Sequence, residues 1–331
     1  MAEQHDMRAL IAGLGDQMKE ALLSPISPEP AAKLTFRGVA ILGMGGSGIG
    51  GAIMSDMLRL SSAIPVVAVS DQVLPGWVDE HCLVVASSYS GNTEETLACL
   101  EEAVKRGCTL AAVTSGGTLL RRAEEAGWPV VQMPGGHPPR SQFGRSFLGL
   151  ARVLRSFGVL TEGDWQALGD AVNGLDAESA EFRGEQLALA VEGKRICLYA
   201  DTSWRGLVTR WRQQLNENSK LLANVEVFPE MNHNELVGWE SGDDSWIAVM
   251  IRTENDHPRS ALRMDITAEV FQGQGADVVM LEPVGESTWM ELLDAVWVGD
   301  WMSLVLAERA EVDPVDIRFI DHLKHTLSEH P

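Results

Sequence analysis

Three serine and threonine hydroxyls occur within the six residues of the segment 88–93, which reads Ser-Tyr-Ser-Gly-Asn-Thr. The segment follows the apolar run 83–86 and precedes a stretch with the pattern of a helix. A helix N-terminus presents unpaired backbone N–H groups, and hydroxyls beside it add further donors, so this arrangement favours an anion such as a phosphate. The alternative is an ordinary capped helix, in which Ser90 or Asn92 is the N-cap and Gly91 is a turn residue.

A glycine-rich segment, 43–51, lies upstream between the apolar run 39–42 and a helical pattern over 52–58. The order of strand, glycine loop and helix is typical of nucleotide and sugar-phosphate sites, and the spacing of the glycines also matches the dinucleotide fingerprint G-x-G-x-x-G. Two features argue against a dinucleotide. The acidic residue that follows the next apolar run, Asp71, lies further along than the fingerprint requires, and Ser47 places a hydroxyl inside the loop, which a pyrophosphate turn does not need.

Four further motifs follow in order, and with the two segments above they resemble the bifunctional phosphoglucose/phosphomannose isomerase family, which has two sugar isomerase (SIS) domains. The motifs lie at Pro139–Gly144, Asn216–Lys220, Pro229–Trp239 and Ile320–Lys324. The match spans roughly residues 36–327, and its most specific part is the Asn-His-Asn-Glu segment. The resemblance implies an aldose-ketose isomerase that interconverts glucose 6-phosphate, and also mannose 6-phosphate, with fructose 6-phosphate by a cis-enediol mechanism without a metal or a cofactor.

Isomerisation of this kind moves a proton between C1 and C2, so it needs a base, a group that opens the sugar ring and a donor for the developing oxyanion. The resemblance implies Glu217 as the base, His233 and Lys324 as ring-opening groups, and Arg140 as the group that stabilises the intermediate. The residues that it implies for phosphate binding are Gly46, Ser47, Ser88, Ser90 and Thr93. Without the motifs, Glu217 would be interpreted as a solvated helix carboxylate paired with Lys220, and His233 as a surface residue.

In the family the ring-opening histidine reaches the active site of the other subunit, so the resemblance also implies a homodimer with shared active sites. Glu235 could orient the imidazole of His233 or cap a following turn. One position departs from the family pattern: related chains commonly carry a threonine after Asp-Pro, where this chain has Val315 after Pro314. Because that threonine is tied to accepting both C2 epimers, Val315 puts the activity on mannose 6-phosphate in more doubt than the activity on glucose 6-phosphate.

The net charge of −21 makes nucleic acid an improbable partner, because phosphate backbones are bound by clustered Lys and Arg. A sugar phosphate is also an anion, so a few well-placed hydrogen-bond donors and Arg140 must make the electrostatic potential positive within one cleft of this acidic protein. The four cysteines have no metal-like spacing and are predicted to be reduced, buried thiols. The sequence shows no signal peptide and no run long enough for a membrane helix, so we expect a cytoplasmic protein without a membrane partner.

Strands alternate with helical patterns in both halves of the chain, which predicts an α/β fold of two SIS domains, each a doubly wound parallel sheet flanked by helices. The expected strands are at about 38–42, 65–69, 82–87, 110–114 and 129–132, and then at 195–200, 246–251 and 277–281. A length of 331 residues is too great for one core. We expect an N-terminal helical lead at 1–30, a first SIS domain at 31–155, and a helical connection with a second SIS domain and a C-terminal helix at 156–331.

Three rival functions remain at this point. An isomerase of the same fold could act on another phosphosugar or on an amino sugar phosphate. A non-catalytic phosphosugar sensor is the non-enzyme alternative, although regulators of that kind attach a basic helix-turn-helix to one SIS domain, and this chain has no basic segment and keeps Glu217 and His233. A nicotinamide-dependent oxidoreductase rests on the glycine-rich segment alone.

Overall fold

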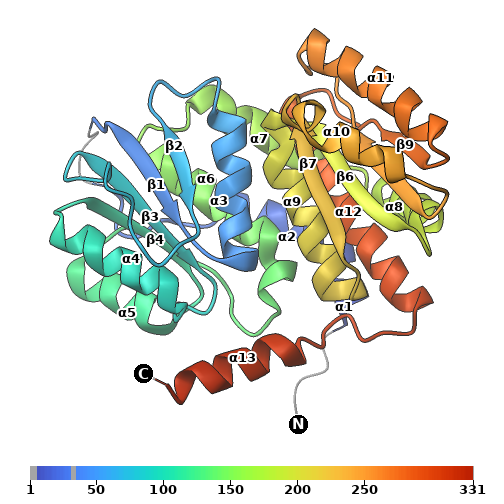
Figure 1. Cartoon of the computed structure of the whole chain (residues 1–331). Helices are drawn as coiled ribbons and strands as arrows, with labels where there is room; N and C mark the ends of the chain where they lie inside the picture. Colours follow the sequence, from blue (N-terminus) through green and yellow to red (C-terminus); the bar gives the residue numbers. More distant parts are fainter. Residues whose placement is uncertain (1–5, 31–34, 331) are drawn as a thin grey trace.

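Two parallel β-sheets lie side by side in the structure, a computed structural model that describes residues 6–30 and 35–330 (Figure 1). The first sheet has the strand order β2-β1-β3-β4-β5 and the second has the order β7-β6-β8-β9. The strands of the first sheet are β1 Gly38–Leu42, β2 Val66–Val69, β3 Cys82–Ser88, β4 Thr109–Thr114 and β5 Val130–Gln132. Those of the second are β6 Arg195–Asp201, β7 Ala223–Phe228, β8 Trp246–Ile251 and β9 Asp277–Leu281. The second sheet therefore repeats the order of the first four strands, which confirms the predicted pair of doubly wound sheets.

The first sheet is covered by helices on both faces, as its nearly unbroken apolar strands require. The inner face is covered by α3 Gly45–Leu58 and α6 Phe143–Ser156, and the outer face by α4 Glu94–Lys105 and α5 Gly117–Ala126 (Figure 1). The register pairs Leu42 of β1 with Ala86 of β3, so both strands end at the same edge of the sheet. The loops that follow them can thus form one site, as is usual at the carboxyl edge of a parallel sheet.

The second sheet is built in the same way. Its inner face is covered by α8 Ala177–Val191, α9 Arg205–Gln214 and α12 Thr288–Arg309, and its outer face by α10 Glu235–Gly238 and α11 Pro258–Gly273. The remaining long helix, α7 Glu162–Gly174, packs against α12 and α2. Trp289, Trp297 and Trp301 are all buried along α12.

One hydrophobic core joins the inner faces of the two sheets. Helices α3 and α9 pack closely at its centre, where a Cβ on Gly206 would lie 2.8 Å from the backbone nitrogen of Ile53. On the other side of α9, a Cβ on Gly299 of α12 would lie 2.2 Å from the indole nitrogen of Trp211. The close approach of α3 and α9 therefore fixes the two halves against each other, while the contact between Trp211 and Gly299 holds α9 against α12 within the second half. The predicted domain limits near residue 155 stay a prediction.

Five local expectations are wrong. The N-terminal helical lead expected at 1–30 is not one helix: it is interrupted at Gly13, giving α1 Met7–Ala12 and α2 Leu14–Leu22, because a glycine in a helix interior costs about 1 kcal/mol. Helix α3 begins at Gly45 rather than near residue 52. Glu217, which the alternative interpretation places on an ordinary helix, lies in a π turn, and strand β7 was not among the expected strands. Of the four cysteines, Cys108 is only partly buried, because it precedes β4 at the sheet margin.

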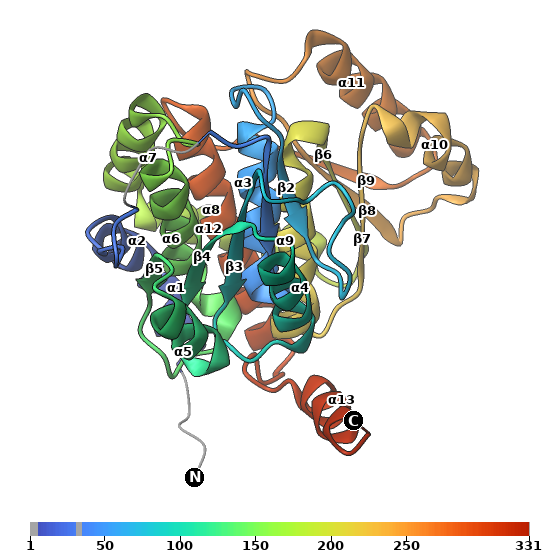
Figure 2. The same ribbon diagram turned by 90° about the vertical axis from the view of Figure 1, so that its left-hand side faces the viewer.

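The C-terminal helix α13 Arg318–Ser328 extends away from the body of the protein (Figures 1 and 2). None of its residues, all of which the structure describes, is buried. Its apolar side chains Phe319, Leu323 and Leu327 are 84%, 58% and 54% exposed. Across residues 6–30 and 35–330, every helix is too short or too polar to cross a lipid bilayer.

Candidate active site

The loop between β3 and α4 carries three of the residues predicted to bind phosphate. The hydroxyls of Ser88 and Thr93 lie 2.8 Å apart and form a hydrogen bond, and Ser88 Oγ also accepts the backbone N–H of Gly91 at 3.1 Å. Ser90 is exposed, and its Oγ accepts the backbone N–H of Asn92 at 3.2 Å. Gly91 has a φ of +67°, and a Cβ there would lie 1.8 Å from Gly116 O, so only glycine fits this turn.

The N-terminus of α4 is open to an anion. Thr93 is the N-cap residue, yet no side chain in the described part of the chain caps the first turn. The first backbone N–H groups of the helix have no partner within the helix, so they can bind the oxygens of a phosphate together with the Ser88–Thr93 pair. Glu94 and Glu95 stand in the same turn, and their charge has to be offset by cations nearby.

The other predicted phosphate residues, Gly46 and Ser47, lie in the first turn of α3 rather than in an extended loop. Ser47 Oγ accepts the backbone N–H of Tyr89 at 2.9 Å, so its own proton stays available to a ligand. A Cβ on Gly46 would lie 3.0 Å from the backbone nitrogen of Arg140. The glycines therefore let α3 start directly beneath the β3–α4 loop and against the segment that carries Arg140, which is why the helix begins earlier than predicted.

Arg140 is buried, with 3% of its surface exposed, and every nitrogen of its guanidinium group has an acceptor. Nε donates to Asn218 Oδ1 at 2.7 Å, Nη1 donates to Glu217 Oε2 at 3.0 Å, and Nη2 donates to the carbonyl oxygen of Pro314. Burial lowers the pKa of Arg140, while the carboxylate of Glu217 acts in the opposite direction. The predicted base and the predicted intermediate-binding arginine are thus in direct contact, although 77 residues separate them in the sequence.

Glu217 lies in the π turn Leu215–Ser219, which continues α9 and ends at Lys220 in a left-handed conformation with a φ of +58°. Such turns are rare and often occur at functional sites. The ammonium group of Lys220 donates to the backbone carbonyl of Glu217 rather than to its carboxylate, so the helix ion pair considered as the alternative is absent between these two residues. The carboxylate, 24% exposed, faces Arg140 on one side and a pocket on the other.

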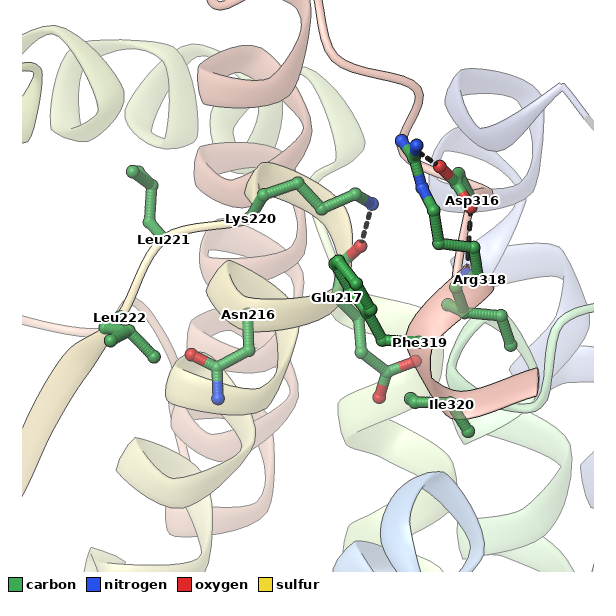
Figure 3. A pocket seen from close by; sticks show the side chains of 10 residues that line it. Asn216, Glu217, Lys220, Leu221, Leu222, Asp316, Arg318, Phe319 and Ile320 are labelled. Carbon is green, nitrogen blue, oxygen red and sulfur yellow. Dashed lines mark hydrogen bonds and ion pairs between the residues drawn. The ribbon is translucent and has the colours of Figure 1, made fainter. Parts of the chain in front are cut away.

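The pocket beside Glu217 has a volume of about 350 Å³ and lies between the π turn and the start of α13 (Figure 3). Asn216 and Lys220 border it from one side, and Asp316, Phe319 and Ile320 from the other (Figure 3). Its volume is in the range of small-ligand sites, about 300–1,000 Å³. Burial and the charge of Arg140 lower the pKa of Lys220, while the carboxylates of Asp316, Asp313 and Glu217 act in the opposite direction. Lys220 and Arg140 are thus two cations among three carboxylates at this end of the site.

His233 lies far from Glu217 within the chain. It ends a 3₁₀ turn, Glu230–His233, that follows the carboxyl end of β7, whereas Glu217 precedes the amino end of that strand. The side chain of His233 is exposed. Glu235 neither orients it nor caps a turn with its side chain: Asn234 is the N-cap of α10, and the Glu235 carboxylate accepts the phenol O–H of Tyr199.

Lys324 lies on the exposed helix α13 and forms no hydrogen bond or ion pair with the described part of the chain. It is four residues beyond Ile320, which lines the pocket, so the two side chains share one face of the helix about 6 Å apart along its axis. Val315 is partly buried against the core, and its backbone N–H donates to Asp313 Oδ1 at 2.8 Å. It directly follows Pro314, whose carbonyl binds Arg140.

Two residues near Glu217 received no role from the sequence. Asn218 is completely buried and binds Arg140, and Lys220 reaches the pocket wall. Both belong to the Asn-Glu-Asn-Ser-Lys motif, so the signal was present in the sequence. The π turn is what separates their roles, because it brings the adjacent side chains of Glu217 and Asn218 onto one guanidinium group.

Comparison with known proteins gives consistent matches. Residues 181–327 match the family model described as the bacterial phospho-glucose isomerase C-terminal SIS domain. The chain is 37% identical over 300 residues to a bifunctional phosphoglucose/phosphomannose isomerase from Aquifex aeolicus, covering 89% of this chain and 92% of that one. It is 33% identical over 224 residues to a D-glucosamine-6-phosphate 4-epimerase from Sulfolobus acidocaldarius, covering 67% and 70%.

A solved structure supports the fold independently. The C-terminal domain of glucosamine-fructose-6-phosphate aminotransferase from Francisella tularensis superposes with a TM-score of 0.76 at 13% identity, covering 94% of this chain and 98% of that one. At this identity the likeness concerns the fold alone, which is that of two SIS sheets. The sequence identity to relatives along almost the whole chain, the matching SIS model and the Arg140–Glu217 pair together lead to one conclusion: the chain belongs to the bifunctional phosphoglucose/phosphomannose isomerase family.

Proposed function

We propose that the protein interconverts glucose 6-phosphate, and also mannose 6-phosphate, with fructose 6-phosphate. The observation that carries this proposal is the contact between Arg140 and Glu217. The start of α3 links this pair to the open N-terminus of α4, because Gly46 packs on the backbone of Arg140 and Ser47 accepts the N–H of Tyr89 in the segment before α4. A carboxylate placed next to a guanidinium group can take a proton from a carbon while the cation binds the oxyanion that forms. The name of the Aquifex aeolicus relative supports the same pair of substrates.

In the proposed reaction the phosphate binds the N-terminus of α4, with Ser47, Ser88 and Thr93 as hydroxyl donors. Glu217 removes the proton from C2 of the open-chain aldose and returns it to C1, while the O–H proton moves from O2 to O1. Removal of the carbon proton gives a cis-enediolate with negative charge on an oxygen, which Arg140 stabilises until proton transfer from O2 to O1 is complete. His233 and Lys324 open the ring by transferring protons to and from the ring oxygen and O1.

We further infer a homodimer in which each active site uses residues of both chains. Glu217 and His233 lie at opposite ends of β7, a six-residue strand that spans about 20 Å. One chain therefore cannot bring both side chains to the same sugar, whereas a two-fold related copy can supply its own His233 to the site. Exposure of His233 is consistent with this role.

The test of the reaction is conversion of fructose 6-phosphate in D₂O, with and without EDTA. An enediol that forms by proton transfer takes deuterium from the solvent, so glucose 6-phosphate should carry deuterium at C2, and turnover should be the same with the chelator. Nuclear magnetic resonance reads both results in one sample. Absence of turnover, or full retention of the hydrogen from the substrate under conditions of slow turnover, would overturn the proposal.

Shared sites are tested by mixing two inactive variants, Glu217→Gln and His233→Ala. In a mixed dimer one site combines both defects and the other is intact, so a random mixture should recover about a quarter of the wild-type activity. If both residues acted from the same chain, every site in the mixture would have one defect and no activity would return. As a control, each variant is dissociated and reassociated separately and only then mixed. Without exchange of subunits, this mixture should stay inactive.

We propose that activity on the second substrate, mannose 6-phosphate, depends on the segment that contacts Arg140. Val315 follows Pro314, and we propose that Val315 reduces turnover of mannose 6-phosphate relative to glucose 6-phosphate. The variant Val315→Thr should raise the mannose-to-glucose ratio of kcat/KM. The Sulfolobus acidocaldarius relative favours D-glucosamine 6-phosphate as a further candidate substrate. It should be assayed in parallel, and a higher kcat/KM for it than for glucose 6-phosphate would replace the proposal.

A further inference from the structure

Asn218 is a completely buried amide at the contact between the two halves of the site. Its Oδ1 accepts Nε of Arg140 at 2.7 Å, and its Nδ2 donates to Ser303 Oγ at 2.9 Å. The first contact reaches a residue of the segment after β5, and the second reaches α12. Asn218 thus links the predicted intermediate-binding arginine to the central helix of the second half.

The amide of Asn218 can adopt only one orientation. Ser303 Oγ donates its single proton to the carbonyl of Asp300 at 2.8 Å, so it can only accept from Asn218. The Nδ2 group must therefore face Ser303, which leaves Oδ1 facing Arg140. An acceptor fixed in this way holds Nε, and because the guanidinium group is planar, it also fixes the direction of Nη1 toward Glu217.

The helix that holds Ser303 is itself firmly anchored. Asp300 accepts Nη2 of the buried Arg210 through both oxygens, at 2.8 and 2.6 Å, and accepts Gln214 Nε2 at 2.6 Å. Arg210 Nη2 also lies 3.4 Å from the backbone carbonyl of Arg140. Backbone and side chain of Arg140 are therefore both held from α9 and α12, through one connected set of buried polar groups.

We propose that Asn218 is a positioning residue that fixes the guanidinium group of Arg140 in the orientation that binds the enediolate. The inference rests on the proposed function, since the enediolate is the intermediate of that reaction. Asn218 does not contact the substrate in this role. Removing its acceptor leaves Arg140 charged and buried, yet free to rotate away from the reacting carbons, so recognition of the intermediate should suffer while phosphate binding should not.

Two ligands separate these effects in a binding experiment. The compound 5-phosphoarabinonate places a carboxylate where the enediolate oxygens form, and glucitol 6-phosphate carries the same phosphate on an uncharged chain. For Asn218→Leu, calorimetry should show an affinity for 5-phosphoarabinonate lower by about tenfold or more, the usual effect of losing one hydrogen bond to a charged group, and an affinity for glucitol 6-phosphate within about twofold of wild type. The kcat should fall with little change in KM.

The matched control is Ser219→Ala. Ser219 Oγ donates to the carbonyl of Ser303, so this variant also loses a buried hydrogen bond between the π turn and α12, but Ser219 does not bond Arg140. Its melting temperature should fall while both affinities and kcat stay at the wild-type values. A purely structural role for Asn218 predicts the same behaviour for Asn218→Leu, and that result would overturn the inference.

A second variant, Asn218→Asp, keeps the size and the acceptor in case the leucine variant does not fold. Its added negative charge lies beside Arg140 and near Glu217, so binding of 5-phosphoarabinonate should weaken and the acidic limb of the pH profile of kcat/KM should move to higher pH. Unchanged binding of both ligands would contradict the inference. If wild type lacked turnover but the variants still lost 5-phosphoarabinonate selectively, the proposed reaction would fail and the positioning of Arg140 by Asn218 would stand.

Discussion

The carboxyl edges of the two sheets have the same topology and opposite chemistry. In the first sheet, β3 is followed by hydroxyl side chains and by the uncapped N-terminus of α4. In the second sheet, the equivalent strand β8 is followed by Thr253, whose N–H and hydroxyl both donate to Asp256, at 3.0 and 2.9 Å. The second edge thus binds a carboxylate of its own where the first is open to a phosphate.

The helix that follows the second edge is also closed to an anion. His257 caps α11 by accepting the N–H of Arg259 at 3.1 Å, and Pro258 has no N–H to offer. A cavity of about 720 Å³ at this edge is lined by several carboxylates, and burial raises the pKa of Asp256 and of Glu291. Two sheets of one topology therefore supply a position for a site, while the residues after one strand decide whether that position binds an anion.

The largest expected effect comes from removing one carboxylate from each region: Glu217, which contacts Arg140, and Glu291, which lines the cavity at the second edge. Glu217→Gln should lower kcat by about 10²–10⁴-fold, because a general base contributes about that factor. Glu291→Gln makes the same chemical change at the second edge and should leave kcat within experimental error of wild type. Steady-state assays with fructose 6-phosphate measure both. Similar losses in the two variants would mean that both edges take part in the reaction.

Removing hydroxyl groups should give an effect of intermediate size, on KM at the first edge and on the free energy of unfolding at the second. The double variant Ser88→Ala/Thr93→Val removes both members of one hydrogen-bonded pair, so it leaves no unpaired hydroxyl, and KM should rise by about 10–100-fold through lost contacts to the phosphate. Thr253→Val removes the hydroxyl that donates to Asp256. This variant should lose about 1–3 kcal/mol of the free energy of unfolding with KM unchanged.

Kinetics and urea denaturation of the two hydroxyl variants should therefore show opposite patterns. A rise in KM for Thr253→Val would place substrate at the second edge. A large loss of stability in the double variant without a change in KM would instead assign Ser88 and Thr93 to the fold, as the capped-helix alternative predicts.

The smallest effect concerns the pH dependence of stability. Burial, together with Asp256 and Glu254 nearby, raises the pKa of Glu291 in the folded state above its ordinary value of 4.5. As the pH rises past that value, the unfolded chain releases the proton first, so ionisation of Glu291 disfavours folding. Glu291→Gln should thus melt at a higher temperature than wild type at pH 7 and at the same temperature at pH 4. A higher melting temperature at both pH values would assign the effect to packing instead.

Much of this arrangement could be predicted from the sequence. The strands of the first sheet lie within one residue of the expected positions, because buried apolar runs bounded by glycine and hydroxyl residues leave little ambiguity. Strand β7 was missed because it is an edge strand whose Asn224 and Glu226 interrupt the apolar run. The π turn could not be predicted, since residues 215–219 are polar after Leu215 and no residue among them separates a π turn from an ordinary helical turn.

The sequence predicted which residues belong to the candidate site, but not the distances and orientations between them. The motifs supplied Arg140 and Glu217, but a distance of 3.0 Å across 77 residues follows from the packing of α3, α9 and α12 around one core. The separation of His233 from Glu217 likewise depends on a strand that was not expected. The role of Asn218 became apparent only from the orientation that Ser303 imposes on it.

The exposed helix α13 has a practical consequence for any preparation of this protein. Because none of its described residues is buried, proteolytic trimming after Arg318 would remove Lys324 without disturbing the common core. We expect the clipped chain to keep its melting temperature and its affinity for phosphate, and to lose the ring opening that we propose for Lys324. A sharp melting curve would then overstate the active fraction. Intact mass, measured by mass spectrometry, would instead report the fraction of chains that still carry Lys324.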